Sequence, residues 1–157
     1  MTDRIELAPL AKMASNALAA AAGDVLALWP AAQRRPLPRT LTSVTHLAEH
    51  EEGHTYDTVA SVGQLGVAVD LEALIARIRT AMTAESVLVF CEPTIASDQP
   101  TTSPPHDVTT SLWRAGLTVF ECRRERRRVR LRTAEYCWGR ARLTPDYAPP
   151  RRWAEGA

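Results

Sequence analysis

Residues 56–92 constrain the fold of this chain more than any other segment, because they read as strand, turn, amphipathic helix and strand in succession. Residues 57–63 have the apolar, β-branched pattern of a strand, and residues 86–91 form the continuous apolar run typical of a strand with helices over both faces. Asp70 is placed to cap a helix whose apolar side chains recur at spacings of three and four, namely Leu71, Leu74, Ile75, Ile78 and Met82. The segment therefore predicts a right-handed βαβ unit with two parallel strands.

Length and charge limit the class of protein. The 157 residues suit a single domain, and a net charge of +1 from 19 basic and 18 acidic residues gives no field that would attract a nucleic acid or an anionic membrane. We therefore predict neither a nucleic-acid partner nor a membrane partner. The dense basic stretch at residues 123–128 is interpreted as the charged tip of a β-hairpin, where arginines protect a sheet edge.

The cysteines and the apolar tracts indicate a cytoplasmic protein. Cys91, Cys122 and Cys137 lie in apolar strand-like runs and lack the spacing of a metal site or a disulfide framework, so we interpret them as buried reduced thiols. The longest apolar tract, residues 17–29, is interrupted by Gly23 and is shorter than the ~20 residues that span a bilayer. No export signal is apparent at the N-terminus.

Further elements are expected on either side of the βαβ unit, from proline and glycine positions and from hydrophobic periodicity. In chain order they are a helix over residues 5–22, a proline-rich loop over 30–38, a strand over 41–47, a second long loop over 98–107, a helix over 108–115, and a final hairpin with strands over 117–122 and 129–143. Residues 24–29 fit either a short buried strand, which we favour, or a continuation of the first helix.

The series of elements over residues 41–143 resembles the second half of class I S-adenosylmethionine-dependent methyltransferases. The pair Tyr56-Asp57 is similar to the aromatic-Asp pair that opens the family's fourth strand, and residues 106–117 resemble its late helix before the final hairpin. The resemblance implies an α/β domain with a shortened Rossmann-like methyltransferase sheet, mostly parallel, with an antiparallel hairpin at its C-terminal edge. It also implies S-adenosylmethionine as the cofactor and a small molecule as the substrate.

The first 40 residues depart from the family pattern at the cofactor site. Where the family has a glycine-rich turn after its first strand, this chain has Trp29 and Pro30, and the ten residues 31–40 are too few and too rich in proline for a parallel crossover with a helix. The acidic residue that the family places after its second strand has no counterpart. We therefore predict one domain that comprises an eroded cofactor half at residues 1–40, the matching half at residues 41–143 and a tail at residues 144–157.

The resemblance also implies positions for site residues. A cofactor would contact the residues just beyond the fourth strand, Ser61, Val62, Gly63, Gln64 and Leu65. Leu47 occupies the position of the family's acidic residue near the adenine, with Glu49 close by. The glycines in this segment allow close backbone approach to a ligand, and they are equally suited to shaping a turn.

Two residues are candidates for a catalytic role. His106, at the start of the late helix, is a possible general base, and Glu92, just past the fifth strand, could be its partner, because ligands of open α/β sheets bind beyond the carboxyl ends of the strands. Both residues are also suited to capping a helix or facing solvent.

The motif from His50 to His54 matches the H-E-x-x-H pattern of zinc hydrolases. On a helix, His50 and His54 would bind the metal and Glu51 would serve as a general base, with Glu72 as the nearest third ligand. The segment is polar on all sides and contains Gly53, so we favour histidines on a solvated loop and expect no metal.

Two functions from different classes stay open. The first is an S-adenosylmethionine-dependent methyltransferase that acts on a small molecule by placing a nucleophile in line with the methyl group. The second is a non-catalytic methyltransferase-like protein that serves as an interaction partner or as a homo-oligomer subunit. Because a shortened first half would leave a sheet edge uncovered, we hypothesise a homodimer that buries this flank.

Overall fold

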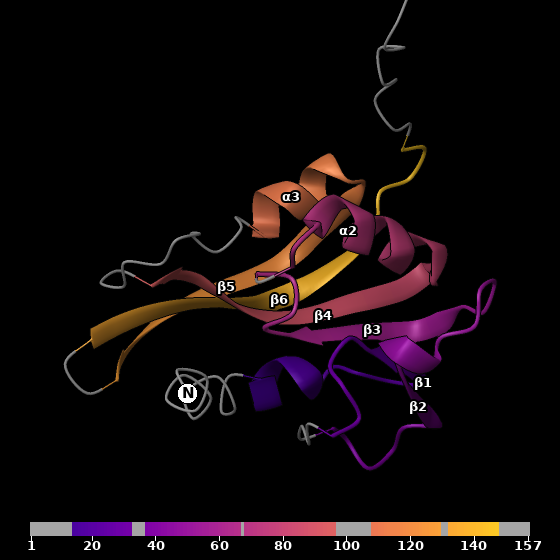
Figure 1. Cartoon of the computed structure of the whole chain (residues 1–157), viewed down its shortest axis with the longest axis horizontal. Coiled ribbons are helices and arrows are strands. Elements are labelled where there is room, and N and C mark those ends of the chain that lie inside the picture. Colours follow the sequence, from indigo (N-terminus) through magenta and orange to yellow (C-terminus); the bar gives the residue numbers. More distant parts are fainter. Residues whose placement is uncertain (1–13, 33–36, 67, 97–107, 130–131, 148–157) are drawn as a thin grey trace, which may run out of the picture.

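The computed structural model of the chain describes residues 14–32, 37–66, 68–96, 108–129 and 132–147, and these form one six-stranded sheet with helices on both faces (Figure 1). The strand order is β2-β1-β3-β4-β6-β5. The strands are β1 (Asp24–Ala27), β2 (Ser43–His46), β3 (Tyr56–Val62), β4 (Met82–Ala96), β5 (Leu117–Val129) and β6 (Arg132–Leu143). The helical elements with described bounds are the 3-10 turn η1 (Leu47–Glu49), α2 (Leu71–Thr80) and α3 (Val108–Arg114).

The predicted βαβ unit is present. Strands β3 and β4 pair in parallel, with Val59 beside Leu88, and α2 connects them. Asp70 caps the helix, because its carboxylate accepts a hydrogen bond of 3.0 Å from the Ala73 amide. The helix ends earlier than its pattern indicated: Met82 begins β4 instead of ending α2, because the turn closes at Ala81, whose amide donates to the carbonyl of Ile78 at 3.0 Å.

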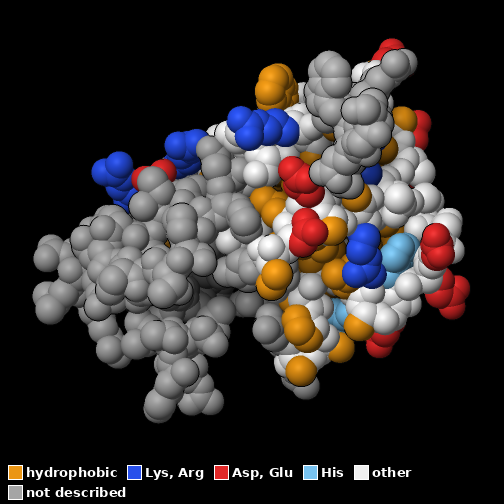
Figure 2. All heavy atoms as spheres, turned by 45° about the horizontal axis from the view of Figure 1, so that its top comes forward, with side chains coloured by type: hydrophobic (Ala, Val, Ile, Leu, Met, Phe, Trp, Pro, Cys, Tyr) orange, Lys and Arg blue, Asp and Glu red, His pale blue; other side chains and the backbone are white. Residues whose placement is uncertain are grey.

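The C-terminal half supplies the predicted antiparallel hairpin. Strand β6 pairs with β4 and with β5, both in antiparallel orientation, so β5 forms the sheet edge. Residues 123–128 are not the hairpin tip, as predicted, but part of β5, where each residue has a partner on β6. Arg126, for example, donates to Glu135 across the strands at 3.2 Å. Figure 2 shows arginine side chains gathered along this hairpin.

Two apolar clusters lie on opposite faces of the sheet. On one face, α2 and α3 bury side chains such as Ile75 and Leu112 against Leu88 and Phe90. On the other face, residues 14–21 lie against the strands; residues 14–18 are helical and agree with the end of the predicted N-terminal helix. Figure 1 shows the three layers, with α2 and α3 above the sheet and the indigo helix below it. The chain is thus an α/β domain with the predicted mostly parallel sheet.

The first half of the sheet corrects one expectation. Strands β1 and β2 are adjacent and parallel, with Val25 beside Val44, although residues 28–42 between them form no helix in their described part. The proline-rich link is therefore long enough for a parallel return over two strands of only four residues each. The strand that resembles the family's fourth, β3, is the third strand of the described chain.

None of the three cysteines forms a disulfide bond, as expected for reduced thiols. Cys91 and Cys137 are buried, but Cys122 is exposed, which corrects the prediction of three buried thiols. Its exposure follows from its position on β5, the edge strand. Among the described residues, no helix is both long enough and apolar enough to cross a membrane.

Candidate functional site

The sheet topology marks one place for a ligand. From β1 the chain turns to one side to form β2, and then returns past β1 to form β3 on its other side. In open α/β sheets such a reversal of strand order leaves a crevice beyond the carboxyl ends of the two central strands, and ligands bind there. The corner beyond Ala27 of β1 and Val62 of β3 is therefore the candidate site.

Glu92 organises the β3 side of this corner. It lies on β4, its side chain is 0% exposed, and it accepts three hydrogen bonds. Its Oε1 accepts from the Ser61 hydroxyl at 2.5 Å and from the Leu65 amide at 3.2 Å, and its Oε2 accepts from the Gly66 amide at 3.1 Å. We call residues 61–66 the β3 turn; all three donors to the carboxylate belong to it.

The charge state of Glu92 is finely balanced. Burial raises the pKa of its carboxyl group from 4.5 to about 7, while the hydrogen bonds from Ser61, Gly66 and Leu65, together with the Gly63 backbone, act in the opposite direction. A buried carboxylate loses its hydration, and the hydrogen-bond donors of the β3 turn replace only part of it. Near neutral pH, both protonation states are therefore populated.

The β3 turn brings together the five residues that the resemblance placed near a cofactor. Gly63 has a φ of 79°, which glycine adopts without strain, and its amide donates to the Cys91 carbonyl at 2.9 Å. The Gln64 side chain accepts from the Val62 amide at 2.8 Å. Ser61, Val62 and Leu65 are buried, whereas Gly63 and Gln64 are partly exposed. Gly63 and Gln64 are thus the members of the set with surface available to a ligand.

The β1 side of the corner has a different character. Beyond Ala27, the Leu28 amide donates to the Ala60 carbonyl at 2.9 Å, so the strand contact continues by one residue. Trp29 is only 2% exposed and packs in the apolar cluster beneath the sheet, and its carbonyl is bonded to His46 Nδ1 at 2.9 Å. Pro30 has no amide hydrogen. The described residues that directly follow β1 therefore do not form a glycine-rich turn.

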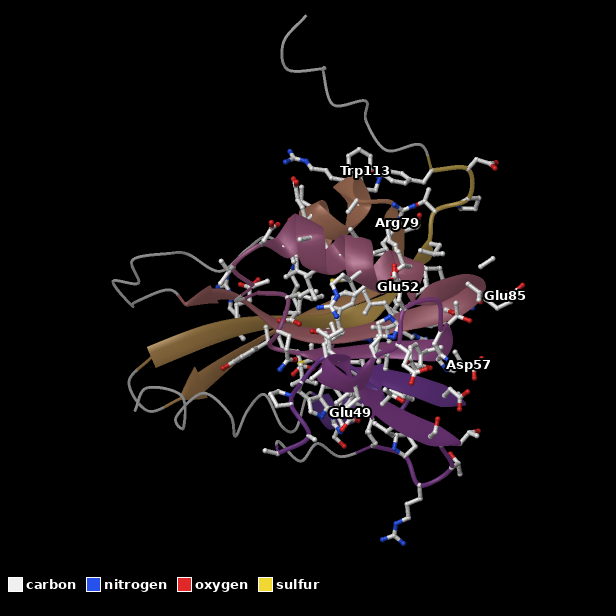
Figure 3. All side chains as sticks on the ribbon, turned by 45° about the vertical axis from the view of Figure 1, so that its right-hand side comes forward. Glu49, Glu52, Asp57, Arg79, Glu85 and Trp113 are labelled. Carbon is white, nitrogen blue, oxygen red and sulfur yellow. The ribbon has the colours of Figure 1, made fainter. Side chains whose placement is uncertain are left out.

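Glu49, the acidic residue that the resemblance placed near a cofactor, lies just beyond β2. It ends η1, three residues beyond His46 at the end of β2, and it is exposed. Since β2 is paired directly with β1, Glu49 follows the strand next to the corner. Figure 3 shows it away from Arg79 and Trp113, which lie on the side of the sheet that α2 and α3 cover.

The histidines do not form the arrangement that zinc hydrolysis requires. Residues 50–55 are not helical, so the H-E-x-x-H geometry is absent, and the remote zinc-hydrolase alternative was wrong on this point. His50 is bonded through Nδ1 to the Tyr56 hydroxyl at 3.1 Å, and the His54 ring packs at a tilt against Tyr56 at 4.7 Å between centroids. Within the described ranges, no group of three potential ligands could hold a metal. The other catalytic candidate, His106, and the loop that contains it lie outside the described residues.

Comparisons with solved structures identify the fold. The chain is similar to Burkholderia thailandensis 1,6-didemethyltoxoflavin-N1-methyltransferase with bound 1,6-didemethyltoxoflavin and S-adenosylhomocysteine, at 13% identity and a TM-score of 0.58, over 91% of this chain and 80% of that one. It is similarly related to the N-methyltransferase NodS from Bradyrhizobium japonicum in complex with S-adenosylhomocysteine, at 14% identity and a TM-score of 0.58, over 89% and 88% of the two chains. The DhpI–S-adenosylhomocysteine complex matches at 16% identity and a TM-score of 0.50, over 88% and 85%.

The sequence itself matches no protein-family model and no curated protein. The structural likenesses extend over nearly the whole chain, and the predicted methyltransferase-like Rossmann fold is confirmed.

Proposed function

We propose that this chain is an S-adenosylmethionine-dependent methyltransferase of a small molecule, with the S-adenosyl group held at the corner between β1 and β3. The observation that carries the proposal is the ordered β3 turn at the carboxyl end of β3, anchored on the buried Glu92 within β4. The same corner is the switch point of the sheet. The structural neighbours support the proposal, since their structures hold S-adenosylhomocysteine.

The residues of this chain have binding and orienting roles in the proposal. Gly63 and Gln64 offer the accessible surface of the β3 turn, and glycine permits close approach of a ligand to the backbone. Glu49 would accept hydrogen bonds from ribose hydroxyl groups, as a carboxylate beside the first strand does in dinucleotide sites. S-adenosylmethionine, when bound, supplies the activated methyl group. The chain contributes the alignment of the acceptor with that group.

A second function is favoured by one specific observation, the buried Trp29 followed by Pro30 where the family has glycines. Residues 28–30, which directly follow β1, include no glycine, and no helix begins in the described part of residues 28–42, so this side of the corner lacks the usual site for the polar end of the cofactor. On this basis the alternative is a non-catalytic methyltransferase-like protein that acts through a protein partner or as an oligomer subunit.

Titration calorimetry on the full chain separates the two functions. Under the first, S-adenosylmethionine and S-adenosylhomocysteine bind with micromolar Kd, equivalent to about −8 kcal/mol. Absence of binding at millimolar ligand would refute the methyltransferase and favour the second function. The variant Gly63→Val should abolish binding, because a β-branched residue is strained at a φ of 79° and crowds the turn.

Gly53→Val is the matched control for that variant. Gly53 also has a positive φ, of 87°, but a Cβ added there meets nothing within 4 Å. It lies in the connector before β3 and not in the β3 turn. A similar loss of binding in both variants would point to a general loss of folding, which circular dichroism would detect, and not to a ligand site at Gly63.

Two properties complete the proposal. We infer a cytoplasmic location, which the three free cysteines support because thiols persist in a reducing compartment. We also infer a homodimer formed through the β2 edge. In support of it, β2 is an edge strand of four residues, and Val44 on it is 38% exposed.

A further inference from the structure

Within the described part of the chain, the hydrogen bonds to Glu92 come from one segment. Its three donors, the Ser61 hydroxyl and the amides of Leu65 and Gly66, all lie in the β3 turn. The acid itself lies on β4, and it is 0% exposed. A buried carboxylate is costly unless it is well hydrogen-bonded, so the turn and the acid depend on each other. Glu92 therefore determines where the β3 turn sits.

We propose that Glu92 is a positioning residue that holds the β3 turn in its ligand-binding shape as a carboxylate, so that binding of an S-adenosyl ligand is coupled to the loss of a proton from Glu92. This inference rests on the proposed function. It replaces a role for Glu92 as a partner of the general base, because the carboxyl group has no exposed surface and both of its oxygens accept bonds from the turn.

The coupling follows from the chemistry of the donors. A backbone N–H group can only donate a hydrogen bond, and a carboxylate accepts on both of its oxygens. A protonated carboxyl group carries an O–H of its own, which competes with the backbone N–H groups for the same space. Docking of the turn thus favours the carboxylate. Burial favours the neutral acid, and the resulting pKa of about 7 leaves both forms populated in the free protein.

Of the described residues that flank Glu92 on the neighbouring strands, one is titratable. Across the sheet its partner is Cys137 of β6. Burial, followed by the nearby Cys122 and Glu92, raises the pKa of the Cys137 thiol, so this thiol stays protonated. On β3 the neighbour is Ser61, which is neutral. Arg124 of β5 pairs with Cys137 and lies one strand further away. The helices over this face contribute apolar side chains, among them Leu71, Ile75, Val108 and Leu112.

The coupling between ligand binding and proton release determines how the affinity for the ligand changes with pH. If only the carboxylate form binds, affinity increases with pH up to the pKa and is constant above it. With a pKa of about 7, one proton gives about tenfold tighter binding at pH 8 than at pH 6. By reciprocity, binding at pH 6 releases nearly one proton and binding at pH 8 releases almost none.

Calorimetry with S-adenosylhomocysteine on the full chain tests this. Titrations at pH 6 and pH 8, each in two buffers with different ionisation enthalpies, give the affinity and the number of protons released. Glu92→Gln should remove both the tenfold pH effect and the proton release. Ser61→Ala, which removes a donor to the carboxylate, should move the midpoint of the pH profile upward. A merely structural role for Ser61 would not move it.

Glu121→Gln is the control. Glu121 is a partly exposed acid on β5 that is paired with Arg140, so its loss should leave the linkage unchanged. Any pH effect that survives in Glu92→Gln comes from other groups, including the amino group of the ligand. Binding that is equally tight at both pH values, or an unchanged profile in Glu92→Gln, would overturn the inference and leave the proposed function standing. Absence of binding at every pH would refute the proposed function and this inference with it.

Discussion

Thr58 and Ala22 are joined by two hydrogen bonds, although they are 36 residues apart. The Thr58 hydroxyl accepts from the Ala22 amide at 3.1 Å and donates to the Ala22 carbonyl at 2.9 Å. The side chain is 3% exposed. One hydroxyl group thus fixes the point at which the N-terminal segment enters β1 against the side of β3, and β1 in turn forms half of the candidate site.

Replacing this hydroxyl tests its contribution. Thr58→Val keeps the shape of the side chain but leaves two backbone groups of Ala22 without partners, so we expect a loss of about 1–3 kcal/mol in the free energy of unfolding. Thr58→Ser, which retains the hydroxyl, should lose less. Urea unfolding followed by circular dichroism measures both. Equal stability of the two variants would show that water replaces the hydroxyl without cost.

Gly23, the next residue, makes a separate prediction. Its φ is 66°, and a Cβ added there would lie 2.1 Å from the Asp57 carboxylate, which itself accepts from the Asp24 amide at 2.9 Å. Gly23→Ala should therefore be destabilised by backbone strain and by the clash, by about 2 kcal/mol or more. Gly53→Ala carries the strain alone, because its Cβ would be in open space. The difference between the urea-unfolding midpoints of the two variants measures the effect of the clash. The double variant Gly23→Ala/Asp57→Ala should recover part of the stability that the clash removes.

The raised pKa of Glu92 predicts how stability depends on pH. A carboxyl group whose pKa is higher in the folded state than in the unfolded state holds its proton more tightly when folded. The stability that this group adds to the folded state is fully present below pH 4.5 and is lost as the pH rises through about 7. The full effect is on the order of 3 kcal/mol.

Urea unfolding of wild type and Glu92→Gln between pH 5 and pH 8 measures this effect. The wild type should lose stability relative to the variant as the pH rises, because the side-chain amide of the variant does not ionise. Parallel profiles for the two proteins would mean that Glu92 does not titrate in this range.

The β2 edge predicts the oligomeric state. Sedimentation of the full chain should show a dimer, and Val44→Arg should shift it toward the monomer, because a charge on a paired edge strand would be buried without a partner. Val69→Arg is the control, because Val69 is fully exposed next to α2 and away from this edge. A wild-type protein that sediments as a monomer at high concentration would refute the proposed dimer.

Much of the fold was predictable because its signals are local. The period of the apolar residues from Leu71 to Ile78 specifies a helix face, and Asp70 starts that helix through its own side chain. Likewise, Gly116 ends the late helix with a φ of 90°. Hydrogen bonding within a few residues produces each of these features, so the sequence alone predicted most of the elements and their order along the chain.

The site depended on contacts between distant segments. The amides of Leu65 and Gly66 donate to Glu92 because β3 and β4 pair in one particular register. No sequence pattern in either segment predicts these hydrogen bonds. The return of β2 to the side of β1, and the exposed position of Cys122 on an edge strand, are also products of strand order. Periodicity specifies which way a side chain faces, but only the assembled sheet specifies its neighbour. The sequence therefore determines the helices and strands, and the tertiary structure determines the hydrogen bonds between Glu92 and the β3 turn.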